Sequence, residues 1–304
     1  MTQRLSFHDQ IASNKIKSFF LIASILAILI LFGYIIAIVA GPDYFFFVMI
    51  LAIIGSLLYI WIGYYNSHSI ALASVNAKPA DPVRYRQFHT IVEGLCLASG
   101  LPKPKLYIME EEHINAFASG RDPKHAVICV TTGCLEKLDK QELEGVLAHE
   151  LSHIANFDIR FMTLTAVLVG MIAIISEIFL RSLFWNSFSN GRDRDNKVHV
   201  FLIIAGILLA ILAPLLVTLV QLAISRKREY TADASAVKFV RSPTGLINAL
   251  KKIKHESALS ASQKHHYNKA VAPLFIADPF KRKLDNLLAT HPPLEKRIAL
   301  LQRM

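Results

Sequence analysis

The five residues His149-Glu150-Leu151-Ser152-His153 carry more structural information than any other part of this chain. They stand in a segment with helical periodicity, where residues four apart share one face, so both imidazoles can reach the same ion. Imidazole nitrogens at such spacing suit zinc. Glu150 lies one step round the helix, close enough to act on a water that the ion activates. The pattern predicts a zinc site with an acid–base carboxylate beside it.

A chance match on an amphipathic helix is the alternative interpretation of these five residues. The surrounding sequence argues against it. Asp139 with Glu142 three residues later resembles a capping box at the start of a helix. The helix then carries a buried stripe beside the ligand face, formed by Leu143, Val146, Leu147, Leu151 and Ile154.

The composition indicates a membrane protein. Apolar residues make up 53% of the 304 residues and the mean hydropathy is +0.41. Four apolar stretches account for this: 18–40, 44–64, 161–180 and 198–224. Each has about the length that a helix needs to cross a bilayer, and the remaining roughly 200 residues suffice for one globular domain. The sequence thus predicts four transmembrane helices in two hairpins, with a mainly α-helical domain outside the membrane.

The distribution of Lys and Arg sets the expected orientation. Both flanks of the first hairpin carry basic residues and its turn, Gly41-Pro42-Asp43, carries none, which places both ends in the cytosol. The predicted segments are a cytosolic N-terminus (1–15), a hairpin (16–64), the first part of the cytosolic domain (65–160), a second hairpin (161–224) and the second part of that domain (225–304). The charged loop 181–197 and Glu177 leave open whether the second hairpin crosses fully or dips in only part way.

The net charge of +10 could also indicate a DNA-binding membrane regulator. Much of the basic charge flanks the apolar stretches, and no nucleic-acid recognition motif is present, so membrane topology explains it better. We therefore expect no nucleic-acid partner. Three cysteines without a C-x-x-C pair predict neither a disulfide framework nor a cysteine zinc site, and fit a reducing compartment.

The rest of the cytosolic part mixes helices with short strands. A helix is expected to open at Asp81-Pro82, with Val83 on its apolar face. Three strands are expected just before the metal helix, followed much later by two further helices. The strands are 105–109, 115–119 and 126–131. One of the two helices spans about 243–258, and the last helix starts near Pro293.

Two histidines do not hold a catalytic zinc, so a third protein ligand is required. Glu229 is the predicted ligand. It stands four residues before Asp233, so the two carboxylates share a helix face: one can bind the metal while the other accepts a hydrogen bond from a ligand imidazole. His153 precedes the second hairpin and Glu229 follows it, so a hairpin that enters and leaves one membrane face returns Glu229 beside His153. A solvated carboxylate pair is the alternative.

At this point the chain resembles the HtpX-type membrane zinc metallopeptidases, relatives of the CAAX prenyl endopeptidases. The resemblance rests on the leading hairpin, Asn115-Ala116-Phe117-Ala118, the H-E-x-x-H segment, the internal hairpin, Ser225 to Asp233, and His291-Pro292-Pro293. It implies a zincin-like catalytic domain with one Zn²⁺ per chain, bound by His149, His153 and Glu229, with Glu150 as acid/base. It also implies quality control of membrane proteins at the bacterial inner membrane, often under stress.

The resemblance further makes His291, supported by Arg297, the candidate donor to the developing oxyanion. An ordinary residue before a Pro-Pro turn is the alternative for His291. The segment Asn115–Ala118 is expected to be an edge strand to which an extended polypeptide substrate adds by main-chain hydrogen bonds. Asn115 could also hold a substrate carbonyl.

Two other functions stay open at this stage. A prenyl-protein endopeptidase would use the same chemistry, but it would require a large membrane chamber, and four apolar stretches are too few to build one. A catalytically dead scaffold would have no chemical need for Glu150 and Glu229. The oligomeric state is not predicted.

Overall fold

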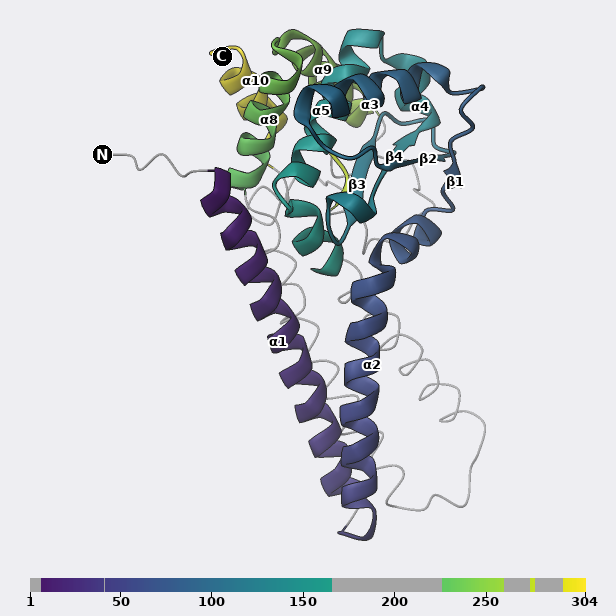
Figure 1. Cartoon of the computed structure of the whole chain (residues 1–304), viewed down its shortest axis with the longest axis vertical. Coiled ribbons are helices and arrows are strands. Elements are labelled where there is room, and N and C mark those ends of the chain that lie inside the picture. Colours follow the sequence, from purple (N-terminus) through teal and green to yellow (C-terminus); the bar gives the residue numbers. More distant parts are fainter. Residues whose placement is uncertain (1–6, 41, 166–225, 260–273, 277–291) are drawn as a thin grey trace, which may run out of the picture.

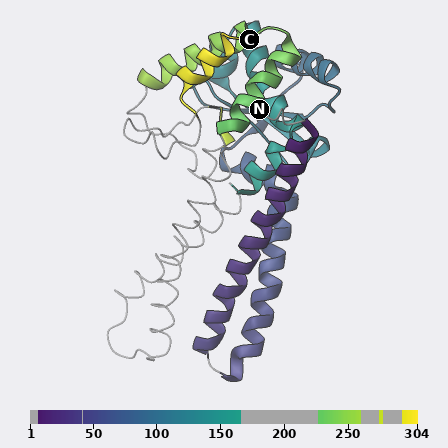
Figure 2. The same ribbon diagram turned by 90° about the vertical axis from the view of Figure 1, so that its left-hand side faces the viewer.

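The computed structural model describes residues 7–40, 42–165, 226–259, 274–276 and 292–304. Two long helices, α1 (Phe7–Ala40) and α2 (Pro42–Ser74), run side by side and project from a globular part (Figure 1). Figure 2 shows the same pair standing away from that part in a second view. The two helices cover the residues of the first predicted hairpin, 16–64, and extend beyond them at both ends, since α1 begins at Phe7 and α2 continues to Ser74.

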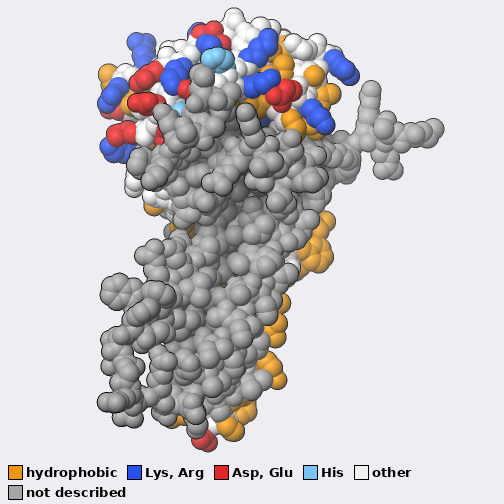
Figure 3. All heavy atoms as spheres, turned by 180° about the vertical axis from the view of Figure 1, so that it is seen from behind, with side chains coloured by type: hydrophobic (Ala, Val, Ile, Leu, Met, Phe, Trp, Pro, Cys, Tyr) orange, Lys and Arg blue, Asp and Glu red, His pale blue; other side chains and the backbone are white. Residues whose placement is uncertain are grey.

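The surface of α2 is suited to lipid rather than water. Among the described residues, α2 is the one helix that is long and apolar enough to cross a membrane. Its most apolar segment has a mean hydropathy of 2.6, and only 6% of that segment is buried. Phe46 is 78% exposed and Trp61 57% exposed. In Figure 3 charged side chains gather on the globular end, whereas hydrophobic side chains border the elongated end. Large apolar side chains left this exposed mark a membrane interaction.

The globular part is built on a four-stranded sheet of order β1-β2-β4-β3. The strands are β1 (Lys78–Pro79), β2 (Lys105–Met109), β3 (Ala116–Gly120) and β4 (Ala126–Thr131). β2 and β4 pair in parallel, and β1 and β3 pair antiparallel on the two edges. The bounds of β2 and β4 match the prediction, and β3 begins one residue later than expected.

The helix α5 (Lys140–Ala155) covers one face of the sheet and holds the H-E-x-x-H residues. Its capping box is present: Asp139 Oδ1 accepts from the Glu142 N–H at 2.9 Å, and Glu142 Oε2 accepts from the Asp139 N–H at 2.8 Å. α3 (Arg86–Ser99), α8 (Arg226–Val240) and α9 (Thr244–Leu259) pack around α5. Gly145 lets α9 approach closely, since a Cβ there would lie 2.5 Å from the backbone nitrogen of Leu246.

Two apolar clusters hold the sheet between its neighbours. One joins α3, α5 and α9 to the sheet through residues such as Ile91, Ile128 and Leu147. The other lies where α2 ends on the sheet and includes Leu72, Phe117, Val127, Met162 and Phe275. The remaining short elements are the 3-10 helix Pro123–His125, α4 (Thr132–Lys137) and α10 (Leu294–Leu301).

The predicted start of the helix after Asp81 was wrong. The side chain of Asp81 accepts hydrogen bonds from the backbone N–H groups of Val83 and Arg84, at 2.9 and 2.7 Å. These bonds stabilise a turn, and α3 begins only at Arg86. Val83 is 87% exposed and therefore contributes nothing to the apolar face. An Asp-Pro pair caps a turn as readily as a helix.

Candidate metal centre

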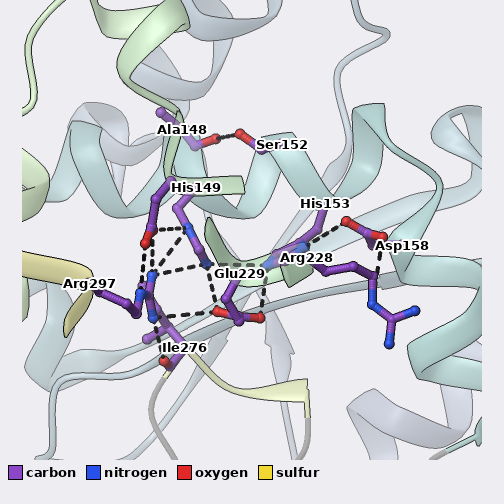
Figure 4. Close-up of polar contacts among 10 residues, drawn as sticks. Ala148, His149, Ser152, His153, Asp158, Arg228, Glu229, Ile276 and Arg297 are labelled. Carbon is purple, nitrogen blue, oxygen red and sulfur yellow. Dashed lines mark hydrogen bonds and ion pairs between the residues drawn. The ribbon is translucent and has the colours of Figure 1, made fainter. Parts of the chain in front are cut away.

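Three buried side chains direct their ligand atoms at one position. His149 and His153 come from successive turns of α5, and Glu229 comes from the first turn of α8 (Figure 4). The Nε2 atoms of the two histidines are 3.2 Å apart. Oε2 of Glu229 lies 3.6 Å from Nε2 of His149, and Oε1 of Glu229 lies 3.6 Å from Nε2 of His153. In a tetrahedral zinc site with bonds of about 2.0–2.1 Å, ligand atoms are separated by about 3.3 Å. The donors and their spacing fit one tetrahedral ion.

The His149 side of this site is fixed from α8 and α10. Nδ1 of His149 lies 2.9 Å from Asp233 Oδ1, and Arg297 holds both Asp233 oxygens at 2.6 and 2.9 Å. Arg297 also lies 3.4 Å from Glu229. All four side chains are buried. Because Nδ1 donates to Asp233, the lone pair of Nε2 faces the other two ligands, as the Glu229–Asp233 spacing led us to expect.

The His153 side is fixed by residues that the sequence did not identify as part of the site. Nδ1 of His153 lies 3.2 Å from Asp158 Oδ2, and Nε of Arg228 lies 3.9 Å from Asp158 Oδ1. Asp158 was not among the predicted site residues. The available signal was its position: a carboxylate five residues after a ligand histidine, just beyond a helix end.

Ionic groups in the site shift the pKa of His149 and Asp233 in opposite directions. Burial and Arg297 lower the pKa of His149, but the carboxylates of Asp233 and Glu229 outweigh both and raise it to about 9. Burial raises the pKa of Asp233, but Arg297 and His149 together bring it below its ordinary value. Without a cation, the site therefore holds a proton on His149 that a metal ion would replace.

Glu150 is 2% exposed and belongs to the same helix as both histidines. Burial raises its pKa above the ordinary value for a glutamate, against the opposing effect of the neighbouring histidines. The backbone N–H of Ala118 on β3 hydrogen-bonds to its carboxylate. A buried carboxyl with a raised pKa accepts a proton more readily than an exposed glutamate does.

β3 is an edge strand beside α5, but its outer edge is not open along its whole length. The backbone N–H of Ile276 donates to the carbonyl of Ala116 at 3.0 Å, and Arg297 donates to the carbonyl of Ile276 at 3.3 Å. The ring of Phe275 packs edge-on against Phe117, with 5.3 Å between centroids. The carboxamide oxygen of Asn115 accepts from the Ala116 N–H. On the edge of β3 that faces away from β4, the backbone of Ala116 is therefore already hydrogen-bonded to Ile276, and the backbone of Ala118 is hydrogen-bonded to Glu150.

The expected oxyanion donor cannot be compared with this geometry, because His291 lies outside the described residues. Arg297, expected to support it, is fully buried against Asp233, Glu229 and Ile276. Its contacts are those of an anchor for the carboxylates of the site.

Comparisons with known proteins show the family to which this chain belongs. The model of peptidase family M48 matches residues 82–304. Curated proteins named protease HtpX homolog are 46% identical in Caldanaerobacter subterraneus, over 81% of both chains, and 43% identical in Thermoanaerobacter pseudethanolicus, over 99% of both. The crystal structure of S. mikatae Ste24p aligns with 95% of this chain and 65% of its own, at 20% identity and a TM-score of 0.47. The chain therefore belongs to peptidase family M48, and its HtpX-type relatives identify it as a membrane-associated metalloprotease.

Proposed function

We propose that this metalloprotease is a zinc-dependent endopeptidase that cleaves misfolded or damaged membrane proteins at the cytosolic face of the bacterial inner membrane. The observation that carries the proposal is the buried triangle of His149, His153 and Glu229 with Glu150 on the same helix. Its protease relatives support peptide-bond hydrolysis.

One zinc ion per chain would be held by His149, His153 and Glu229. Neutral imidazole and carboxylate donors suit zinc, and three protein ligands leave one position for water or substrate. When bound, the ion supplies a Lewis acid that favours deprotonation of water and polarisation of the scissile carbonyl. The three cysteines are buried, and Cys129 and Cys134 have pKa values raised by burial, so they do not compete as thiolate ligands.

Glu150 would transfer the proton in this reaction. Its carboxylate accepts a proton from the attacking water and then delivers that proton to the nitrogen of the leaving amine, so the peptide bond breaks without a net change in Glu150. The raised pKa of Glu150 supports both steps, because a carboxyl with a pKa nearer neutrality both accepts and returns a proton readily. By resemblance, His291 would donate a hydrogen bond to the oxyanion.

An extended substrate would lie along β3. The segment Asn115–Ala118 leads directly to Glu150, which supports pairing of the substrate main chain with this edge. Pairing at the Ala116 carbonyl requires that the Ile276 N–H give up its bond there, whereas pairing beyond Ala118 does not. Main-chain hydrogen bonds depend little on the side chains of the substrate, which suits a protease that accepts many polypeptides.

The membrane topology that we propose has two hairpins, 16–64 and 161–224, with the termini and the two parts of the catalytic domain, 65–160 and 225–304, in the cytosol. The helix pair of α1 and α2 supports the first hairpin. Arg160 and Arg121 lie near the rings of Tyr64 and Tyr65, at 5.9 and 4.9 Å, as expected where a membrane helix enters the lipid surface. A site at this surface favours membrane proteins as substrates and the bilayer as a partner.

The topology can be tested by labelling a cysteine in the loop between the third and fourth apolar stretches. If the second hairpin crosses the membrane, Ser187→Cys should react with a membrane-impermeant maleimide added to intact spheroplasts. The native cysteines are buried, so the label reports only the introduced cysteine. Protection of Ser187→Cys until the membrane is opened would show that the second hairpin does not cross.

The activity can be tested on the full chain purified in detergent. The proposal expects about one zinc per chain, cleavage of casein, loss of cleavage on chelation and recovery with added zinc. A protein that binds zinc but cleaves neither casein nor an unfolded membrane protein would be a scaffold. Cleavage restricted to a prenylated C-terminal peptide would replace the proposal with a prenyl-protein endopeptidase.

A further inference from the structure

The two ligand histidines are each backed by a carboxylate, and each carboxylate by an arginine. Asp233 and Arg297 stand behind His149, whereas Asp158 and Arg228 stand behind His153 (Figure 4). We propose that Asp158 is a positioning residue for the metal site: it accepts a hydrogen bond from Nδ1 of His153 and thereby directs Nε2 toward the metal position, with Arg228 holding Asp158 in place. This inference rests on the proposed zinc site.

The burial of these groups supports a specific contact rather than a surface ion pair. His153 is 5% exposed and Asp158 is 1% exposed. A buried imidazole nitrogen that donates to a carboxylate has a fixed tautomer and a fixed ring orientation. Asp158 Oδ2 lies 3.2 Å from Nδ1, whereas Nε2 of the same ring lies 3.6 Å from Glu229. The two ring nitrogens therefore face different carboxylates, one behind the ring and one in the ligand set.

The backbone takes an unfavourable conformation to bring Asp158 to this place. α5 ends at Ala155, and Phe157 then has a φ of 58°, in the left-handed region that a residue with a Cβ rarely adopts. The chain returns to helix at Asp158. This single reversed residue turns the Asp158 side chain back toward His153 on the last turn of α5. Such strain persists where the surroundings require it, and it is concentrated at functional sites.

Arg228 provides a matching cation from α8, one residue before the ligand Glu229. Its Nε lies 3.9 Å from Asp158, and its guanidinium group packs over the ring of Phe161 at 4.9 Å. The side chain is 10% exposed. Arg228 thus places a positive charge beside Asp158, and a hydrogen bond from an imidazole N–H to a carboxylate is stronger than one to a neutral acceptor.

The test measures zinc affinity of the full chain in detergent, by competition with a chromophoric chelator. Asp158→Asn should weaken zinc binding by about 10–100-fold, the effect of removing an outer partner of a ligand histidine. The matched control is Asp122→Asn, which removes a carboxylate 2.8 Å from Nδ1 of His125, a histidine outside the ligand set. The control should bind zinc within about twofold of the unchanged chain, since no metal ligand loses its partner. An Asp158→Asn protein with the affinity of the control would overturn the proposal.

Two readouts separate positioning from general support of the fold. The rise in unfolding temperature on adding zinc should shrink in Asp158→Asn, because the stabilisation by a ligand follows its affinity. A purely structural role would lower both temperatures and leave their difference unchanged. If the variant fails to fold, the proposal can still be tested on the unchanged chain labelled with ¹⁵N-histidine, by measuring proton exchange at His153 Nδ1. Its zinc form should show a slowly exchanging His153 Nδ1–H, and rapid exchange of that proton with water would overturn the proposal.

Discussion

The two sides of the metal centre are built alike but from different distances along the chain. The His149 side joins α5 to Asp233 on α8 and Arg297 on α10, with contacts of 2.6–2.9 Å. The His153 side uses Asp158, five residues away, and Arg228, with contacts of 3.2 and 3.9 Å. The comparison shows one side fixed by tight long-range ion pairs and the other fixed by a local turn with a looser cation.

A change that leaves both sides intact should have the largest effect. Glu150→Gln keeps His149, His153 and Glu229 as they are but removes the group that accepts and returns the proton. Turnover should fall by at least about 10²–10⁴-fold, with zinc content unchanged. Cleavage rate and zinc content are measured together. Glu144→Gln on the same helix is the control, and near-normal cleavage by Glu150→Gln would remove Glu150 from the mechanism.

Removal of the two arginines should separate the tight side from the loose side. Arg297→Met removes the guanidinium group that pairs with the buried carboxylates of Asp233 and Glu229, which should cost about 3–5 kcal/mol of unfolding free energy. Arg228→Met should cost clearly less. It breaks one 3.9 Å ion pair, and it also removes a buried positive charge, whose desolvation lowers the pKa of Arg228. Denaturant unfolding of the metal-free proteins in detergent measures both. Equal losses would contradict the difference between the two sides.

The two carboxylates should act independently on zinc affinity. Measured above pH 9, where His149 is largely neutral in both proteins, Asp233→Asn alone should weaken binding by about 10–100-fold, because His149 loses its Nδ1 partner. Combined with Asp158→Asn, the two losses should multiply, since each carboxylate orients a different ring. Chelator competition on the two single variants and the double variant gives the answer. A double variant no weaker than either single one would mean that the carboxylates act through one shared element.

The pH dependence of zinc binding should report the His149 side. Zinc requires the neutral imidazole, and Asp233 and Glu229 raise the pKa of His149 to about 9, so His149 is protonated at pH 7. Zinc affinity should therefore rise by about tenfold per pH unit from 7 toward 9 and level off above it. In Asp233→Asn the His149 pKa falls, so this slope should flatten between pH 7 and 9. An unchanged slope would assign the proton to another group.

The local parts of this architecture could be predicted from the sequence, because short-range rules govern them. The capping box at Asp139 and Glu142 marked the start of α5, and short apolar runs marked β2 and β4. The spacing of His149 and His153, and of Glu229 and Asp233, placed each pair on one helix face. The convergence of these two faces needed the assumption of an intervening hairpin, and the resemblance to a known family supported it.

The parts that could not be predicted depend on backbone geometry or on distant contacts. The residues Asn156-Phe157-Asp158 do not indicate that Phe157 adopts a left-handed conformation, so Asp158 was not predicted to be a partner of His153. The bond from Ile276 to Ala116 spans 160 residues of sequence, and no periodic pattern records it. Arg297 followed from resemblance alone, and its contact with Asp233 required the fold.

The most direct measurement is anomalous diffraction at the zinc edge from crystals of the zinc-loaded full chain. We predict one zinc peak per chain, about 2.0–2.1 Å from the Nε2 atoms of His149 and His153 and about 2.0–2.2 Å from a carboxylate oxygen of Glu229. A peak bound by other side chains, or zinc-loaded crystals without a peak between these three residues, would contradict the metal centre from which the proposed function follows.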